Sequence, residues 1–290
     1  MNIDALRAFL SVAEHTSFST AAEQLHLSQP AVSKRIKQLE DELGQRLFNR
    51  LARRVHLTEA GRALLPGARA ILLEVEESRR RLSQLTDRVT GRLSIGSSHH
   101  IGLHRLPALL RRFIRTFPEV DLDLQFLDSE TGCRLVEKGD LELAVVTLPI
   151  KTPDALLSTP VWDDPLMIMV AADHPLTACP VADCATLADH PAILPAAGTY
   201  TRALIDRAMK PHHLSPMIRL ETNYLETIRS MVSIGMGWST LPLTMLDARL
   251  RVIDVPEMKM KRQLGFIRHQ GRTLSNAARA LIRSALTENE

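Results

Sequence analysis

Apolar side chains recur with helical spacing in two segments at the start of the chain. Residues 2–15 carry them at positions i, i+3, i+4 and i+7, which is the spacing of an amphipathic helix. Residues 17–25 predict a second, shorter helix, because Thr20 and Glu23 have the spacing of a capping box. The pattern therefore predicts two consecutive short helices.

A third helix follows after a three-residue turn. Ser28 is its predicted N-cap, Pro30 stands in its first turn and Gly44 ends it. Its apolar positions recur at i, i+4, i+7 and i+11, so one face is buried and the other is polar and basic. Residues 46–58, RLFNRLARRVHLT, then predict a hairpin with basic residues at its tip. Together these elements predict a winged helix-turn-helix, although capped amphipathic helices also occur in other helical bundles.

Residues 58–90 predict one long helix with a continuous apolar seam. The apolar positions alternate with spacings of four and three residues, the heptad pattern of a coiled coil, and the charged residues lie mostly off this seam. Pro66 and Gly67 should bend or loosen the first turns. Because the seam has no core of its own to face, we expect it to pair two subunits; packing against the same chain is the alternative. The predicted dimerisation residues are Leu64, Ile71, Val75, Leu82 and Leu85.

From residue 91 onward the pattern changes to strands that alternate with helices. Period-two and short apolar runs predict strands, and amphipathic segments lie between them, an order that implies a parallel sheet covered by helices. A second unit of the same kind begins after Trp162, and the last helix is expected to return to the first unit. We therefore predict two α/β lobes, one formed by residues 91–161 and 269–290 and the other by residues 162–268.

Composition limits the class of protein. The chain has 290 residues, of which 45% are hydrophobic and 24% charged, as in ordinary globular proteins. No apolar run is long enough to span a membrane, and the first residues do not resemble a secretory signal. Three cysteines are too few for a disulfide scaffold and indicate a reducing compartment, so we expect a cytoplasmic protein.

The net charge of +3 is unevenly placed. All of it falls in residues 1–90, and basic residues are concentrated between positions 28 and 57. A basic patch at one end of a neutral body is typical of a nucleic-acid-binding module attached to a larger domain, although a solvated charged surface gives the same pattern.

The first 66 residues, taken together, resemble the N-terminal domain of the LysR-type transcriptional regulators. The matching segments occur in the same order and without gaps: SFSTAAEQL, SQPAVSKRIKQLEDELG, LFNR and LTEAG. The rest of the chain also follows the pattern of that family, so the resemblance covers essentially the whole sequence.

The resemblance implies a fold and a domain organisation. It implies an N-terminal all-α winged helix-turn-helix domain over residues 1–57, a long linker helix that pairs two subunits over 58–90, and an effector-binding domain over 91–290. The effector domain is expected to be α/β and two-lobed, like a type 2 periplasmic binding protein. The implied partners are double-stranded DNA that carries an interrupted palindrome, RNA polymerase and a small-molecule inducer. The chain is also expected to form a homodimer and a homotetramer.

The candidate DNA-binding residues lie on the third helix and at the tip of the hairpin. Side chains that can hydrogen-bond face outward early in the helix and suit base edges, whereas lysines and arginines suit phosphates or a minor groove. The candidates are Gln29, Ser33, Lys34, Lys37, Arg53 and Arg54. Arg35 and Arg46 are left out, because either one can instead pair with the acidic residues at positions 40–42.

The candidate effector-binding residues follow predicted strands and precede predicted helices. Ligands of open α/β sheets bind at such places, where helix N-termini present free N–H groups, although Ser, Thr and Asn also cap helices without binding anything. The resemblance places the inducer cleft between the lobes at these positions. The candidates are Ser98, His99, Thr147, Thr199, Tyr200 and Asn223. Only Arg202 supplies a positive charge there, and we expect a small anionic metabolite as inducer.

Three other classes of function compete with this interpretation. No catalytic motif is present, and Gly235-Met236-Gly237 is expected to be a turn rather than a dinucleotide loop, so we expect neither an enzyme nor a bound cofactor. The adjacent pairs at 99–100 and 212–213 point in different directions, so we expect no metal site. Redox sensing by Cys179 and Cys184 is disfavoured, because no basic residue lies between them to lower a thiol pKa. An architectural DNA-binding protein would not need two lobes.

Overall fold

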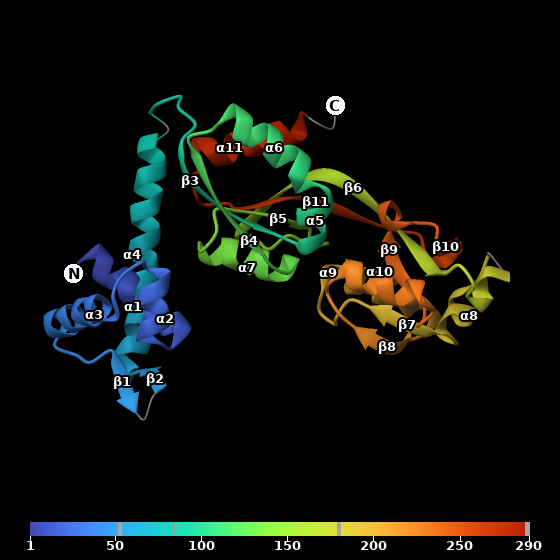
Figure 1. Cartoon of the computed structure of the whole chain (residues 1–290), viewed down its shortest axis with the longest axis horizontal. Coiled ribbons are helices and arrows are strands. Elements are labelled where there is room, and N and C mark those ends of the chain that lie inside the picture. The colour runs from blue at the N-terminus through green and yellow to red at the C-terminus, as the bar shows by residue number, and fades with distance from the viewer. Residues whose placement is uncertain (52–53, 84, 179–180, 288–290) are drawn as a thin grey trace. The chain divides into compact units, whose positions relative to one another are not determined.

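The structure is a computed structural model that describes residues 1–51, 54–83, 85–178 and 181–287. It divides into two compact units, Met1–Leu85 and Thr86–Glu290, which are described separately (Figure 1). The described chain contains no helix with the length and apolar character that a membrane span requires.

The first unit is a helical bundle with a hairpin and a long helix. Its elements are α1 (Ile3–His15), α2 (Phe18–Gln24), α3 (Gln29–Leu43), β1 (Phe48–Leu51), β2 (Arg54–Leu57) and α4 (Glu59–Ser83). The side chains of Asn2, Ser17 and Ser28 accept hydrogen bonds at the starts of the first three helices. Ser28 is the predicted N-cap of α3, whereas α2 is capped by Ser17 and not through the predicted pair of Thr20 and Glu23. Phe9 and Phe48 lie in one apolar core, so the hairpin packs on the bundle. The winged helix-turn-helix is confirmed.

The second unit consists of two α/β lobes, as predicted. The elements of the first lobe are β3 (Gly91–Ser97), α5 (His99–His104), α6 (Leu106–Thr116), β4 (Val120–Phe126), α7 (Ser129–Lys138), β5 (Leu143–Thr147) and α11 (Asn276–Leu286). Those of the second are α8 (Cys184–Ala188), β7 (Pro191–Leu194), α9 (Tyr200–Met209), β8 (Met217–Glu221), α10 (Leu225–Ser233), β9 (Ser239–Pro242) and β10 (Leu250–Ile253). Short 3₁₀ turns lie at Pro175–Ala178, Lys210–His212, Leu243–Met245 and Pro256–Met258.

Two long strands, β6 (Leu156–Ala171) and β11 (Met260–His269), run through both lobes (Figure 1). They pair antiparallel, and the large sheet has the order β10-β6-β11-β5-β3-β4, with β9 on the second-lobe part of β6. Strand β3 lies parallel to both β4 and β5, while β7 and β8 form a separate parallel pair. The lobes are therefore joined by a continuous hydrogen-bonded ladder.

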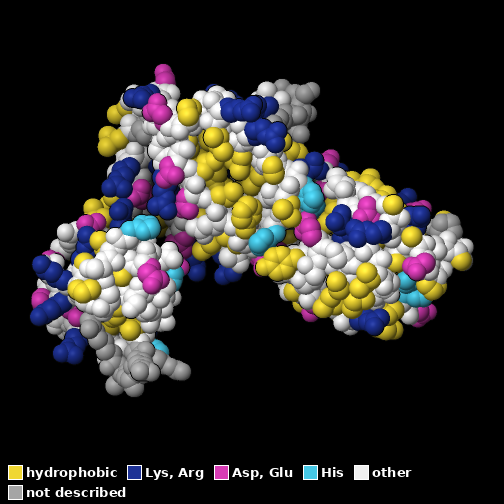
Figure 2. Space-filling view, viewed as in Figure 1, with side chains coloured by type: hydrophobic (Ala, Val, Ile, Leu, Met, Phe, Trp, Pro, Cys, Tyr) yellow, Lys and Arg dark blue, Asp and Glu magenta, His cyan; other side chains and the backbone are white. Residues whose placement is uncertain are grey.

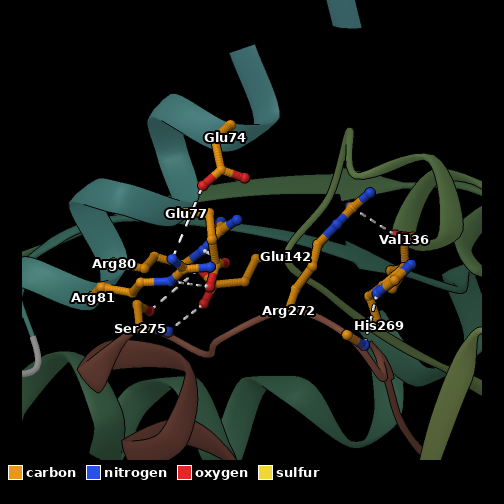
Figure 3. A network of polar contacts seen from close by, with 10 residues as sticks. Glu74, Glu77, Arg80, Arg81, Val136, Glu142, His269, Arg272 and Ser275 are labelled. Atoms are coloured by element: carbon orange, nitrogen blue, oxygen red, sulfur yellow. Dashed lines mark hydrogen bonds and ion pairs between the residues drawn. The ribbon is translucent and has the colours of Figure 1, made fainter. Parts of the chain in front are cut away.

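The last helix returns to the first lobe, as expected, and a carboxylate fixes its start. Glu142 accepts hydrogen bonds from the backbone N–H and the hydroxyl of Ser275, at 2.6 and 3.2 Å (Figure 3). The same hydroxyl accepts from the N–H of Ala278 and caps α11. Nearby, Arg272 donates to the carbonyl of Val136 at 3.3 Å (Figure 3). These bonds tie the C-terminal segment to the loop before β5 and to α7.

The linker helix is shorter than the sequence predicted. The heptad pattern predicted a helix to residue 90, but α4 ends at Ser83 and residues 85–90 are not helical. The side-chain amide of Asn276 donates to the carbonyls of Thr86 and Arg88, at 2.7 and 2.9 Å, and Val89 packs on the core of the first lobe. Tertiary contacts of the second unit thus replace the last helical turns, and Leu85 lies beyond the helix.

Three glycines illustrate how the backbone constrains the second unit. Gly235 and Gly237 form a turn after α10, with φ of 81° and 155°, so the expected turn is found there. Gly265 marks the shift of register between β6 and β11. A Cβ atom on Gly265 would lie 2.2 Å from the carbonyl oxygen of Thr159, so no larger residue fits between the crossing strands.

Substituting Gly265 tests this close approach. We expect Gly265→Ala to lower the free energy of unfolding of the second unit by about 1–3 kcal/mol, because backbone must move to admit the methyl group. Urea denaturation followed by tryptophan fluorescence measures the change. Gly271→Ala is the matched control, since the nearest atom to its Cβ would be 3.5 Å away. Equal stability of the two variants would contradict the packing argument.

Candidate functional site

Helix α3 presents a polar face opposite its core face. Val32, Ile36 and Leu39 are buried, which leaves the other side of the helix in solvent. Of the predicted contacts, Gln29, Ser33, Lys34 and Lys37 all lie on this helix, and the Gln29 amide donates to the Ser33 hydroxyl at 3.4 Å. Arg53 lies outside the described residues, and Arg54 is described only through its backbone at the start of β2.

A surface groove extends this face toward the hairpin. Ser33, Lys34 and Lys37 line it together with Arg46 and Asn49, which sequence reasoning did not select. Arg35 forms an ion pair, as the alternative interpretation predicted. Its partner is Asp4, at 3.5 Å, and not one of the acidic residues at positions 40–42. Glu40 instead accepts hydrogen bonds from the N–H groups of residues 47 and 48. No ion pair of Arg46 occurs within the described residues, so its charge faces the groove.

The second candidate site is a small cavity between the two lobes. It has a volume of about 60 Å³ and lies where β3, β5 and β8 end and α9 begins. Its first-lobe lining comes from the residues that follow β3, β4 and β5, and its second-lobe lining from the loops before α9 and α10. The predicted residues among its lining are Ser98, His99, Thr147, Thr199 and Asn223.

Tyr200 is placed differently from the other five predicted residues. Its backbone N–H, at the start of α9, donates to the Glu130 carboxylate at 2.6 Å, and its ring packs on a first-lobe apolar cluster that includes Cys133. Burial raises the pKa of the Tyr200 hydroxyl, so it stays protonated at neutral pH. Tyr200 does not line the cavity in the described structure and instead links the second lobe to the first.

The positive charge of the cavity comes from Arg262, not from Arg202 as predicted. Arg202 is engaged elsewhere, in ion pairs of 2.8 and 2.7 Å with Asp206 and Glu221. Arg262 lies on β11, is 6% exposed and lines the cavity. Its Nε donates to Asp164 at 2.7 Å and its Nη1 to the Thr201 hydroxyl at 2.8 Å. Within the described residues its Nη2 has no hydrogen-bond partner.

A period-two signal in the sequence points to Arg262. Positions 262, 264 and 266 lie on the same face of a strand, and Leu264 and Phe266 are fully buried. A charged residue on the buried face of an apolar strand requires a buried partner, here Asp164, which stands directly opposite in the β6–β11 register. Arg262 lies inside a strand, so the rule that ligands bind where strands end did not predict it.

The polar groups of the cavity include acceptors as well as donors. Asp128 and Glu130 line it, while Asn223 uses its carbonyl oxygen to accept from the N–H of Ala196 at 3.0 Å, leaving its amide N–H groups available. The His99 ring lies at the edge, 4.8 Å from the Tyr224 ring centroid. The cavity therefore suits a small polar molecule that both accepts and donates hydrogen bonds.

Comparisons with protein families match both units of the chain. The family described as "Bacterial regulatory helix-turn-helix protein, lysR family" matches residues 3–62, and the "LysR substrate binding domain" matches residues 86–290. A RuBisCO operon transcriptional regulator of Allochromatium vinosum is 31% identical over 288 residues, covering 98% of this chain and 95% of its own. The transcriptional dual regulator OxyR of Escherichia coli is 31% identical over 282 residues, covering 94% and 91%.

Solved structures are similar in fold to the whole chain or to its second unit. A full-length OxyR variant from Pseudomonas aeruginosa has a TM-score of 0.70 and 26% identity, covering 99% of this chain and 94% of its own. Full-length CbnR in complex with its target DNA has a TM-score of 0.67 and 20% identity over all of both chains. The regulatory domain of Synechocystis CcmR in complex with 2-PG has a TM-score of 0.62 and 24% identity, covering 69% and 98%. Because CbnR and CcmR are less than 25% identical to this chain, their similarity shows only that the fold is shared.

Proposed function

Because the chain belongs to the LysR family of bacterial helix-turn-helix transcription regulators, we propose that a small anionic metabolite binds between its lobes and modulates its binding to DNA. The observation that carries this proposal is the buried Nη2 of Arg262, a charged donor without a partner among the described residues. An unpaired buried donor is costly, and an anionic oxygen at the cavity would satisfy it.

The carboxylates of the cavity refine the chemistry of the metabolite. Asp128 and Glu130 would repel an anion that carried no donor, so the metabolite should also present hydroxyl groups toward them. A hydroxycarboxylate or a phosphorylated hydroxy acid has this combination. Solved relatives bind compounds of comparable size: the CcmR regulatory domain is described with 2-PG, and the QuiR effector-binding domain with shikimate.

Thiol oxidation is a weaker alternative, although several relatives are described as hydrogen peroxide-inducible activators. Cys133 and Cys184 are buried, and burial raises the pKa of both thiols. A raised pKa lowers the fraction of the reactive thiolate at neutral pH. Cys179 lies outside the described residues. A metabolite therefore accounts better than peroxide for the chemistry of the described cavity.

On DNA, α3 is the proposed recognition helix in the major groove. Gln29 and Ser33 would contact base edges, and Lys34 and Lys37 would contact phosphates. Arg53 and Arg54 at the tip of the hairpin remain predicted contacts to phosphates or to a neighbouring minor groove. With two copies related by symmetry, each recognition helix would read one half-site of an interrupted palindrome.

The linker helix is the proposed dimer contact. Ile71 and Leu82 are exposed on α4, Leu82 by 65%, whereas Leu64 packs partly on the core of its own unit. Exposed leucines at heptad spacing are stabilised when a second helix covers them. Contacts between effector domains would then build the tetramer, and RNA polymerase remains a proposed partner.

The DNA proposal predicts a selective loss in Gln29→Ala. Binding to the DNA upstream of the protein's own gene should weaken by about 1–3 kcal/mol, whereas binding to scrambled DNA should not change, because only base contacts are lost. Fluorescence anisotropy over a range of salt concentrations measures both. Gln24→Ala, on the exposed side of α2, is the control. If both DNAs lose affinity equally, Gln29 does not read bases.

The ligand proposal is tested with the double variant Asp164→Asn/Arg262→Gln, which removes both charges and leaves no unpaired buried ion. Shikimate and a panel of other hydroxycarboxylates, each beside its neutral amide, are screened by thermal unfolding. We expect at least one acid, and none of the amides, to raise the Tm of the wild type, and the double variant to lose that shift. Lys261→Gln, an exposed neighbour on β11, should retain it.

Either of two results would contradict the ligand proposal. Neutral amides that stabilise as well as the acids would show that charge is not recognised. An undiminished shift in the double variant would place the ligand away from Arg262.

The dimer proposal predicts that Leu82→Glu weakens self-association. A buried, unpaired carboxylate at the seam would oppose the pairing of two α4 helices. Sedimentation velocity should show a smaller assembly at concentrations where the wild type remains associated. Glu74→Gln, also exposed on α4, is the control and should behave like the wild type. An unchanged assembly in Leu82→Glu would exclude this part of the seam from the interface.

A further inference from the structure

Two histidines and a glutamate come together where the lobes meet. His100 and His104 lie four residues apart on α5 of the first lobe, and Glu226 lies on α10 of the second. Glu226 Oε1 is 3.4 Å from His100 Nδ1 and 2.9 Å from His104 Nε2. Figure 2 shows histidine side chains in cyan beside acidic side chains in magenta at this junction. His100 also lines the cavity between the lobes, whereas His104 and Glu226 do not.

The geometry of the cluster is close to that of metal ligands. In a tetrahedral zinc site with bonds of about 2.0–2.1 Å, neighbouring ligand atoms lie about 3.3 Å apart. One candidate ligand atom from each of the three residues lies within 4.8 Å of those from the other two. An ion could therefore enter with small side-chain movements, and a water molecule could occupy the fourth position.

We propose that His100, His104 and Glu226 bind one divalent transition-metal ion of the zinc type and that the ion bridges the two lobes. Imidazole nitrogens at positions i and i+4 on a helix share one face and can bind the same ion. A carboxylate completes a ligand set of the kind that zinc takes when three protein side chains leave an open position. Because the ligands come from both lobes, the ion would hold α5 and α10 in their present arrangement.

The charges around the cluster permit a cation. Glu226 contributes a carboxylate, and the two imidazole rings each turn a nitrogen atom toward it. Arg262 acts on His100 and would repel an ion, but its charge is offset by Asp164, with which it forms a buried pair of 2.7 Å.

The sequence showed only part of this cluster. The adjacent pair His99 and His100 predicts no shared metal site, because neighbouring residues on a helix point in different directions. His104 has the informative spacing from His100. Glu226 lies more than a hundred residues away, and only the docking of the two lobes brings it near.

Zinc binding to the full-length, untagged protein tests the proposal. The protein is dialysed against a chelator and titrated with Zn²⁺ in competition with a chromophoric chelator at pH 7.5, and Co²⁺ reports the geometry through its visible absorption. We expect one ion per chain and a tetrahedral Co²⁺ spectrum. His104→Gln and Glu226→Gln should each lower zinc affinity by more than about 10-fold, because each loses a direct ligand.

Two controls separate this site from other metal binding. Both substituted side chains are partly exposed and can still hydrogen-bond, so circular dichroism should show folded variants. His212→Ala removes an exposed histidine outside the cluster and should bind zinc like the wild type. Equal zinc affinity in wild type, His104→Gln and Glu226→Gln would overturn the proposal, as would a wild type that cannot compete with the chelator.

Hydrogen exchange tests whether the ion bridges the lobes. Zinc should slow the exchange of amides in both α5 and α10 of the wild type and in neither helix of Glu226→Gln. Protection confined to α5 would overturn the assignment of Glu226 as a ligand. This result does not depend on the identity of the inducer, so it can fail while the ligand proposal stands.

Discussion

The second unit depends on one buried ion pair at the point where its two lobes are joined. Asp164 and Arg262 face each other across the ladder of β6 and β11, with Asp164 fully buried and Arg262 nearly so. Burying two charges is costly unless good hydrogen bonds satisfy them. Here each partner keeps one polar atom, Oδ1 of the aspartate and Nη2 of the arginine, without a partner among the described residues. Because Arg262 lines the cavity and its Nη2 has no partner among the described residues, this atom can donate to an acceptor in the cavity.

The crossing strands also limit how the lobes can move. Because β6 and β11 stay paired through both lobes, a change in the cavity is transmitted as a bend or twist of one ladder rather than as a separation. A ligand shifts such an equilibrium only by its difference in affinity between the two arrangements. Under the ligand proposal, residues that line the cavity from opposite lobes, such as Thr147 and Asn223, would be the source of that difference.

Local patterns in the sequence predicted the fold well because each pattern has a local cause. The serine at the cap position of α3, and apolar residues at helical spacing, predicted the winged helix-turn-helix from local sequence alone. The predicted end of the linker helix was wrong. Residues 85–90 are held by contacts from α11 and from the core of the first lobe, and these contacts come from residues distant in sequence. The role of Arg262 was missed for the same reason, because it depends on Asp164 in the opposite strand. The sequence also did not show that the Tyr200 ring packs on the apolar cluster of the other lobe.

The contacts between the lobes explain why this arrangement can respond to small polar ligands. Glu130 of the first lobe accepts from the N–H of Tyr200, and Glu226 of the second is hydrogen-bonded to two first-lobe histidines. Hydrogen bonds of this kind can be replaced by hydrogen bonds to water at a small net cost in free energy. They therefore contribute more to the geometry of the lobes than to stability. The Tyr200 ring is different, because a bend that moves α9 away from the first lobe would expose its apolar surface to water. An anion bound in the cavity would compete with Glu130 for the start of α9, and a cation bound at the histidines would screen Glu226. Both would therefore act on the contacts between the lobes, and any coupling between the two ligands must be reciprocal.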